Sequence, residues 1–238
     1  MPTILQAFLG RPDDTPAGDA FERRLYVCRR TIEKKADAEF ALRDKIFYVC
    51  SMSSRTIVYK GMLVATQMRR FFTDLNDAAV KTAVALVHSR YSTNTTPSWE
   101  RAHPNRFIIH NGEINTLKGN VNWIRAREPN LYSPVLQHDL ERVMPIINRE
   151  GSDSAILDNV LEFLVMNGRP LTRAASMLLP EPWDHNDSLS EERRAYDATS
   201  HAHGALGRPG RHRLYRRSHA GCRPRPQRPA PRPLLCDA

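Results

Sequence analysis

The clearest hydrophobic period in the chain runs through SDSAILDNVLEFLVMNG, residues 152–168. Its apolar residues recur at the three- and four-residue spacing that lines one face of a helix. They are Leu157, Val160, Leu161, Leu164 and Val165. Ser152 can cap the first turn of this helix, and Gly168 can end its last turn. A second helix is predicted over residues 171–180, where Pro180 stops it.

Apolar residues in the first half of the chain come in short β-rich runs instead. Such runs cover residues 25–33, 46–53, 56–61, 82–90 and 106–112. Continuous or alternating apolar character over these lengths predicts strands. Only Ser-Arg separates the second run from the third, which indicates a hairpin. The last two runs are predicted to be buried neighbours in one sheet.

Helical spacing returns in residues 63–75 and in residues 119–129, where Pro129 stops the helix. Asp19 is a candidate N-cap for one or two helical turns. The charged residues 34–44 form a loop or a short helix. Strands and helices therefore come in clusters rather than in strict βαβ alternation, which favours an α+β fold with antiparallel sheets.

Composition is ordinary for a soluble globular protein. The chain has 238 residues, of which 41% are hydrophobic and 26% charged, enough for one domain or one and a half. No apolar run approaches the roughly 20 residues of a membrane span. The opening MPTILQAFLGRPDD lacks the basic and long apolar regions of a signal peptide. We therefore expect a cytoplasmic location and no membrane partner.

The net charge of +9 belongs mostly to the end of the chain. Residues 201–238 contain nine Arg, one Asp and neither Lys nor Glu, which gives +8 and leaves residues 1–200 nearly neutral at +1. The last forty or so residues, 197–238, are rich in Arg and Pro and are predicted to be disordered. As protein, this tail could bind nucleic acid or an acidic surface, which is the alternative function.

The four cysteines have no spacing that is typical of a metal site. Cys28 and Cys50 lie in the apolar runs LYVC and IFYVC, so both are expected to be buried, reduced thiols.

Three segments place polar residues at the ends of apolar elements, where active sites tend to form. In the first, HSRYSTNT, the run 82–90 ends at Arg90 and is followed by Thr93 and Asn94. The planar guanidinium of Arg90 can hold a carboxylate through two parallel hydrogen bonds. Taken alone, Arg90 is better explained by a surface ion pair.

The second segment is HNGEINT, where the side chain of Asn111 and the N–H of Gly112 could donate to one oxygen atom. Such a pair stabilises the negative charge of a tetrahedral intermediate. The simpler alternative is a hairpin turn. In the third segment, REGSDSA, Asp153 could accept from an ammonium group or could only complement the helix dipole. Together the three segments could hold a free α-amino acid while its side-chain carbonyl is attacked.

The continuous stretch HSRYSTNTTPSWERAHPNRFIIHNGEINTLKGN closely resembles the glutaminase domain of the glutamate synthase large subunit. The similarity extends from about Gly18 to about Ala195, which makes residues 1–196 a partial class II glutamine amidotransferase domain. The resemblance implies a four-layer αββα sandwich of the N-terminal-nucleophile hydrolase type.

By this resemblance Arg90 binds the glutamine α-carboxylate, with Thr93 and Asn94 beside it. Asn111 and Gly112 form the oxyanion hole, and Asp153 holds the α-ammonium. The family's nucleophile is a cysteine at the mature N-terminus, and no cysteine here matches it. We therefore expect a fragment, truncated at its N-terminus, that is inactive alone.

The resemblance also implies partners and cofactors outside these residues. FMN and an iron–sulfur cluster belong to other domains of the intact enzyme, which also has a small subunit, so no cofactor is expected in this chain. A fragment without any independent role is a further possibility, because an incomplete sandwich exposes the edge of a sheet.

The tail is interpreted as a reading-frame error. Residues 203–209 can be encoded so that a shift of one base downstream gives MEPWDG, and residues 221–238 then permit AAVLDRNGLRPARYYVT. Both readings resemble the continuation of the family's domain. The hypothesis is a frameshift between about Tyr196 and Ser200, in which case the arginines have no role and nucleic acid is not a partner.

Overall fold

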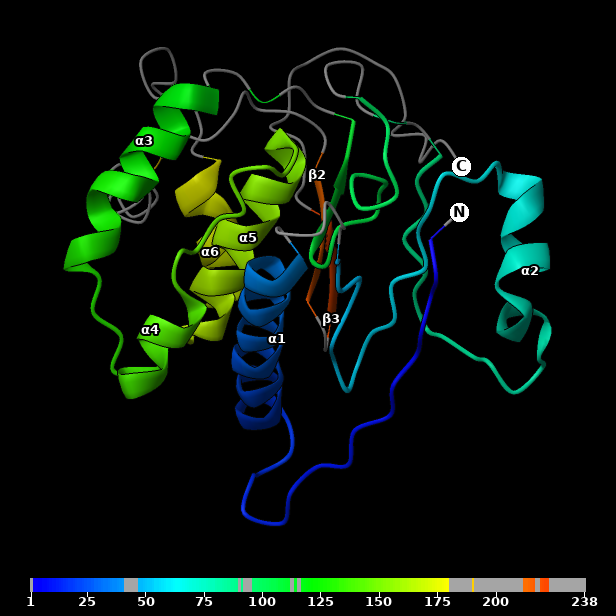
Figure 1. Ribbon diagram of the computed structural model, residues 1–238, viewed down its shortest axis with the longest axis horizontal. Helices are drawn as coiled ribbons and strands as arrows, with labels where there is room; N and C mark the ends of the chain where they lie inside the picture. The colour runs from blue at the N-terminus through cyan, green and yellow to red at the C-terminus, as the bar shows by residue number, and fades with distance from the viewer. Residues whose placement is uncertain are drawn as a thin grey trace.

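The computed structural model describes residues 2–40, 47–89, 91, 96–111, 114, 117–179, 190, 212–216 and 219–222. Its α-helices are α1 Asp19–Phe40, α2 Met68–Phe71, α3 Leu117–Arg127, α4 Leu140–Val143, α5 Asp153–Met166 and α6 Leu171–Leu178. Its strands are β1 Ile108–His110, β2 His212–Arg216 and β3 His219–Cys222. In Figure 1, helices α1, α4, α5 and α6 gather on one side of the strands, and α2 lies on the other side.

Helix α5 confirms the prediction made from its hydrophobic period. The Ser152 Oγ accepts a hydrogen bond from the Ala155 N–H at 3.2 Å, which caps the first turn. Gly168 has φ of +84°, the left-handed conformation that commonly ends a helix. The predicted helices in residues 119–129 and 171–180 are also confirmed, as α3 and α6, although Pro180 lies outside the described residues. Pro129 falls in the 3₁₀ turn Glu128–Asn130 that follows α3.

The apolar core lies where α5 and α6 meet α1 and β1. Its buried side chains include Tyr26, Phe107, Ile108, Val143, Ile147, Leu161, Ala174 and Met177. Strand β1, predicted within residues 106–112, is buried along its whole length. The core therefore brings α1 together with β1 and with helices α4, α5 and α6, all of which lie far from α1 in the sequence.

A buried carboxylate on α5 holds the start of β1 in place. Asp158 accepts hydrogen bonds from the backbone N–H groups of Arg106 at 3.1 Å, Phe107 at 2.7 Å and Ile108 at 3.0 Å. Burial raises the pKa of Asp158 to about 6, helped by the nearby charge of Glu162 and opposed by Arg106 and these N–H groups. One side chain thus satisfies three consecutive main-chain donors that would otherwise be buried without partners.

The prediction of a strand over residues 25–33 is wrong, because these residues belong to α1. The buried face of α1 carries charged residues beside apolar ones, which hides the helical period from a hydrophobicity pattern. Arg29 donates to both carboxylate oxygens of Glu33 at 2.8 Å and forms a fully buried ion pair with Glu162 of α5. On a hydrophobicity scale Arg29 counts as a polar, exposed residue. In the folded protein it is buried and forms ion pairs with Glu33 and Glu162.

Cys28 is likewise not a buried thiol, since it lies on the exposed side of α1. Cys50 is partly buried, and burial raises the pKa of its thiol. The expectation for Cys28 is therefore wrong, while that for Cys50 agrees in part.

The hairpin predicted from residues 46–61 is absent from its described part, residues 47–61, which has no strand. The run 82–90 was expected to be a buried strand, but residues 82–89 form no strand, and Val87 is 76% exposed. Helical spacing in residues 63–75 is confirmed in part by α2 and by two 3₁₀ turns beside it, Ala65–Gln67 and Thr73–Asn76. Residues 34–40 continue α1 rather than forming a loop.

The strands form one antiparallel sheet in the order β1-β2-β3. Ile108 pairs with Leu214, and Leu214 pairs with Gly221. These two pairings involve residues of the tail 197–238, most of which lies outside the described residues. The disorder expected for the tail stays a prediction. The described part contains helices and an antiparallel sheet, as an α+β fold requires, but it lacks the second sheet of an αββα sandwich. Within this part, no helix is both long and apolar enough to span a membrane.

Candidate active site

The end of β1 carries the first of the predicted site residues. Asn111 follows His110 directly and is exposed. Its side-chain Oδ1 lies 2.7 Å from the Nε2 of His88, within hydrogen-bonding distance. The segment 82–89, although it is not a strand, thus ends against the residue that follows β1.

The start of α5 carries the second predicted site residue, Asp153. Ser154, the residue after Asp153, donates to the Asp153 Oδ1 from its backbone N–H at 2.7 Å and from its Oγ at 3.2 Å. The Ser154 Oγ also lies 2.8 Å from the Nε2 of the buried His110. Because His110 and Asn111 are neighbours in the chain, this contact brings the second and third predicted segments together.

A row of three histidines connects these two positions. The ring of His88 packs on that of His103 with 4.5 Å between centroids, and His103 packs edge-on against His110 at 5.5 Å. Burial, with smaller contributions from the charges of His88, His110 and Lys60, lowers the pKa of His103 to about 3. His103 is therefore neutral at physiological pH. The row runs from Asn111 at one end to Ser154 and Asp153 at the other.

Four of the predicted site residues lie outside the described part of the chain: Arg90, Thr93, Asn94 and Gly112. Neighbouring residues are attached to the rest of the protein. The Tyr91 hydroxyl donates to the Gly61 carbonyl at 2.6 Å. Arg101 donates to the carbonyl of Glu150 at 3.1 Å, just before α5. The roles of these four residues, like those of Asn111 and Asp153, remain predictions.

The histidine row was missed by sequence reasoning. His88 and His110 both fall within the polar segments singled out above, next to residues with predicted roles. Nothing in their spacing indicates that both rings pack against His103. His103 has no local signal at all. Ser154 could have been noticed, because it follows Asp153 in the first turn of a well-capped helix.

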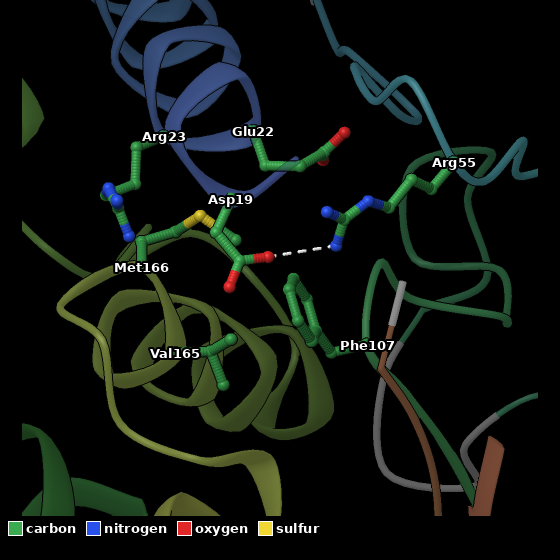
Figure 2. A pocket seen from close by; sticks show the side chains of 7 residues that line it. All are labelled: Asp19, Glu22, Arg23, Arg55, Phe107, Val165 and Met166. Atoms are coloured by element: carbon green, nitrogen blue, oxygen red, sulfur yellow. Dashed lines mark hydrogen bonds and ion pairs between the residues drawn. The ribbon is translucent and has the colours of Figure 1, made fainter. Parts of the chain in front are cut away.

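A pocket lies at the other end of α5, away from Asp153. Figure 2 shows its lining: Asp19, Glu22, Arg23, Arg55, Phe107, Val165 and Met166. Arg55 pairs with Asp19 at 2.9 Å across its mouth. Glu22 accepts from the backbone N–H of Ser54 at 2.8 Å. None of the residues predicted for the site lines this pocket, which lies where α1, the end of α5, Phe107 and Arg55 meet.

In the described part of the chain, no group of three or more His, Cys, Asp or Glu side chains is arranged to hold a metal ion. The three histidines, whose rings pack against one another in a row, do not form such a group.

Comparison with known proteins adds to the geometry. The family model of class-II glutamine amidotransferases matches residues 1–204. The chain is 51% identical over 195 residues to the glutamate synthase (NADPH) large chain of Bacillus subtilis (strain 168), covering 82% of this chain and 13% of that protein. It is 46% identical over 204 residues to the glutamate synthase (NADH) of Schizosaccharomyces pombe, covering 82% and 9%.

A third relative is the chloroplastic ferredoxin-dependent glutamate synthase of Oryza sativa subsp. japonica, 43% identical over 190 residues, covering 80% of this chain and 12% of that protein. The chain therefore spans only between 9% and 13% of the length of these relatives. Their names specify NADPH, NADH and ferredoxin, respectively, and all three are similar to this chain. The chain belongs to the class-II glutamine amidotransferases and, within them, to the glutaminase domains of glutamate synthase large chains.

Proposed function

We propose that this chain is the part of a glutamate synthase that binds free glutamine for hydrolysis of its side-chain amide. Water replaces the amide nitrogen, so that glutamate and ammonia are the products, and the ammonia passes to 2-oxoglutarate at a synthase site elsewhere in the full-length protein. FMN, an iron–sulfur cluster and a small subunit belong to that larger assembly. The complete domain closes into a four-layer αββα sandwich of the N-terminal-nucleophile hydrolase type.

The contact between the ends of β1 and α5 is the observation that supports this proposal most directly. The 2.8 Å contact between His110 Nε2 and Ser154 Oγ connects the residue before Asn111 with the residue after Asp153. In the proposal, Asn111 donates to the carbonyl oxygen of the scissile amide as it becomes an oxyanion, together with Gly112. Asp153 accepts from the α-ammonium of the same glutamine molecule.

The remaining roles concern the other end of the substrate and the attacking group. Arg90 grips the α-carboxylate, with Thr93 and Asn94 beside it. The nucleophile is a cysteine at the mature N-terminus, activated by its own amine, as the family resemblance implies. Cys28 and Cys50 lie in α1 and in the segment after it, outside the three polar segments. We therefore propose that the 238-residue polypeptide binds glutamine but does not hydrolyse it.

Calorimetric titration of the purified 238-residue protein with L-glutamine tests the binding. We expect saturable binding that Asp153→Asn weakens about tenfold or more, because a charge-assisted hydrogen bond to the ammonium is lost. Ser152→Ala is the matched control, since it removes the cap of the same helix and leaves the carboxylate in place. Absence of saturable binding, or equal affinity in Asp153→Asn and the wild type, would contradict the proposed site.

An ammonia assay on the same protein tests the second part. No release above the blank is expected at saturating glutamine. Robust, saturable release would show that the polypeptide contains its own nucleophile and would overturn that part of the proposal alone.

The basic tail has no function in this proposal, because it is a reading of the coding sequence in the wrong frame after about residue 197. The family match supports this boundary, since it ends at residue 204, close to where the arginine-rich sequence begins. Sequencing of the encoding DNA decides the matter. Codons for residues 203–209 that are incompatible with the shifted reading MEPWDG would end it.

A further inference from the structure

We propose that His88 is a positioning residue that holds the side-chain amide of Asn111 in the orientation needed to donate to an oxyanion. This inference rests on the proposed function, in which Asn111 faces the scissile amide of glutamine. Only the Nδ2 end of an asparagine can donate, and a half-turn of the amide exchanges Nδ2 with Oδ1. Asn111 is exposed, so packing does not select one orientation. A specific hydrogen bond has to select it.

The contact with His88 makes this selection. The His88 Nε2 lies 2.7 Å from the Asn111 Oδ1, so an N–H on Nε2 donates to the amide oxygen. The Nδ2 group is then turned away from His88 and can donate elsewhere. The reversed amide would place two donors against each other and lose the hydrogen bond. His88 therefore imposes the useful orientation as long as its Nε2 carries a proton.

The histidine row keeps the His88 ring in place. Its ring packs on His103 with an interplanar angle of 32°, and His103 is neutral because burial lowers its pKa to about 3. A neutral neighbour supports the ring without like-charge repulsion. His103 in turn packs edge-on against His110, which contacts Ser154 beside Asp153. His88 is thus connected through His103 and His110 to α5, the helix that carries the proposed ammonium acceptor Asp153.

Two substitutions separate the ring packing of His88 from its hydrogen bond. His88→Phe retains a flat ring against His103 but has no donor. His88→Gln restores an N–H donor near the position of Nε2 and loses the ring. A role in donation predicts that Gln substitutes for His88 and Phe does not, whereas a role in packing predicts the opposite order.

Nuclear magnetic resonance of the isotopically labelled full chain reads the orientation without any ligand. Asn111→Ala identifies the Asn111 side-chain signals. In the wild type we expect the Nε2-protonated form of His88 and a ¹³Cγ shift of Asn111 typical of a hydrogen-bonded carbonyl. The carbonyl shift should persist in His88→Gln and move to that of a solvent-exposed amide in His88→Phe. A His88 ring protonated only on Nδ1, or an Asn111 signal unchanged in His88→Phe, would overturn the inference.

Ligand binding provides the functional readout. L-glutamine carries the carboxamide that Asn111 would contact, whereas L-norvaline has the same α-amino acid group and ends in a methyl. We expect His88→Phe to weaken glutamine binding about fivefold, the effect of one hydrogen bond, with norvaline binding unchanged. Equal weakening of both ligands would indicate a general structural role and overturn the inference.

The two proposals fail differently. If the wild type binds neither ligand, the proposed glutamine site is wrong, and the resonance measurements on Asn111 and His88 still decide whether His88 orients the amide.

Discussion

The helical side of the protein and the segment 47–89 are both rich in apolar residues, yet they are held in place by different forces. On the helical side Leu161 is only 1% exposed, packed among residues of α1, α5 and α6. In the segment 47–89, Ile57 is 61% exposed and Val87 76% exposed. The segment is attached mainly by polar contacts, such as the Ser54 hydrogen bonds to Glu22 and the ion pair of Arg55 with Asp19.

The difference shows that apolar composition alone does not tell where the core forms. Helices α5 and α6 bury their apolar faces because a buried strand and α1 supply the opposite surface. The segment 47–89 meets no comparable surface within the described residues. Each hydrogen bond contributes about 1 kcal/mol to stability, so we expect the segment 47–89 to open at a lower free energy than α5.

The largest effect is expected at the junction of α5 with β1. Asp158→Ala removes the acceptor of three buried backbone N–H groups and leaves nearby Arg106 without this carboxylate. We expect the free energy of unfolding to fall by about 3–5 kcal/mol in urea titrations. Glu141→Gln, on the exposed side of α4, is the control and should change it by less than about 0.5 kcal/mol. A loss of under about 1 kcal/mol in Asp158→Ala would mean that these hydrogen bonds are dispensable.

A matched pair of truncations tests the contrast between the two regions directly. Leu161→Ala should lower the free energy of unfolding by about 3 kcal/mol, because it leaves a cavity in the core. Ile57→Ala should change it by less than about 0.5 kcal/mol, because most of that side chain is already in water. Similar losses in both variants would show that the segment 47–89 buries its apolar surface after all.

The smallest effect is expected at Glu22, through which α1 is hydrogen-bonded to the segment 47–89. Glu22→Gln weakens the hydrogen bonds from Ser53 Oγ at 3.0 Å and from Ser54 N–H at 2.8 Å. We expect a global loss of about 1–2 kcal/mol, with faster hydrogen exchange at the Ser54 amide than at amides of α5. Asp37→Asn, exposed on the same helix, should leave the Ser54 exchange rate unchanged. Uniform acceleration across α5 as well would argue that Glu22 supports the core and not the segment alone.

Prediction from the sequence succeeded where a single element carries its own signals. Helix α5 has an apolar stripe, a capping serine and a terminal glycine within 17 residues, and the structure follows all three. It failed for α1, whose buried face contains Glu22, Arg29 and Arg30. Those charges are buried only because Glu162 and Glu33 accept from Arg29 and other polar groups meet the rest. The hydrophobicity pattern of α1 does not show that Glu162, a partner of Arg29, will lie against it, because Glu162 belongs to α5.

The candidate site divides in the same way. Local chemistry makes Asn111 and Asp153 candidates, as an amide after a strand and a carboxylate in the first turn of a helix, and the family resemblance implies their roles. The histidine row could not be predicted, because His88, His103 and His110 become neighbours only through the packing of three segments. The proposed orientation of the Asn111 amide depends on that packing.

The sequence by itself determined the family of this protein, the helices with complete local signals and the buried strand β1. Caps, turns and hydrophobic periods act over a few residues, so they can be read without knowing the fold. Only the tertiary structure decided that α1 is a helix with a charged buried face, that the segment 47–89 is attached by polar contacts, and that three histidines connect Asn111 to Asp153. Each of these depends on side chains far apart in the sequence, whose burial and pairing exist only after the chain has folded.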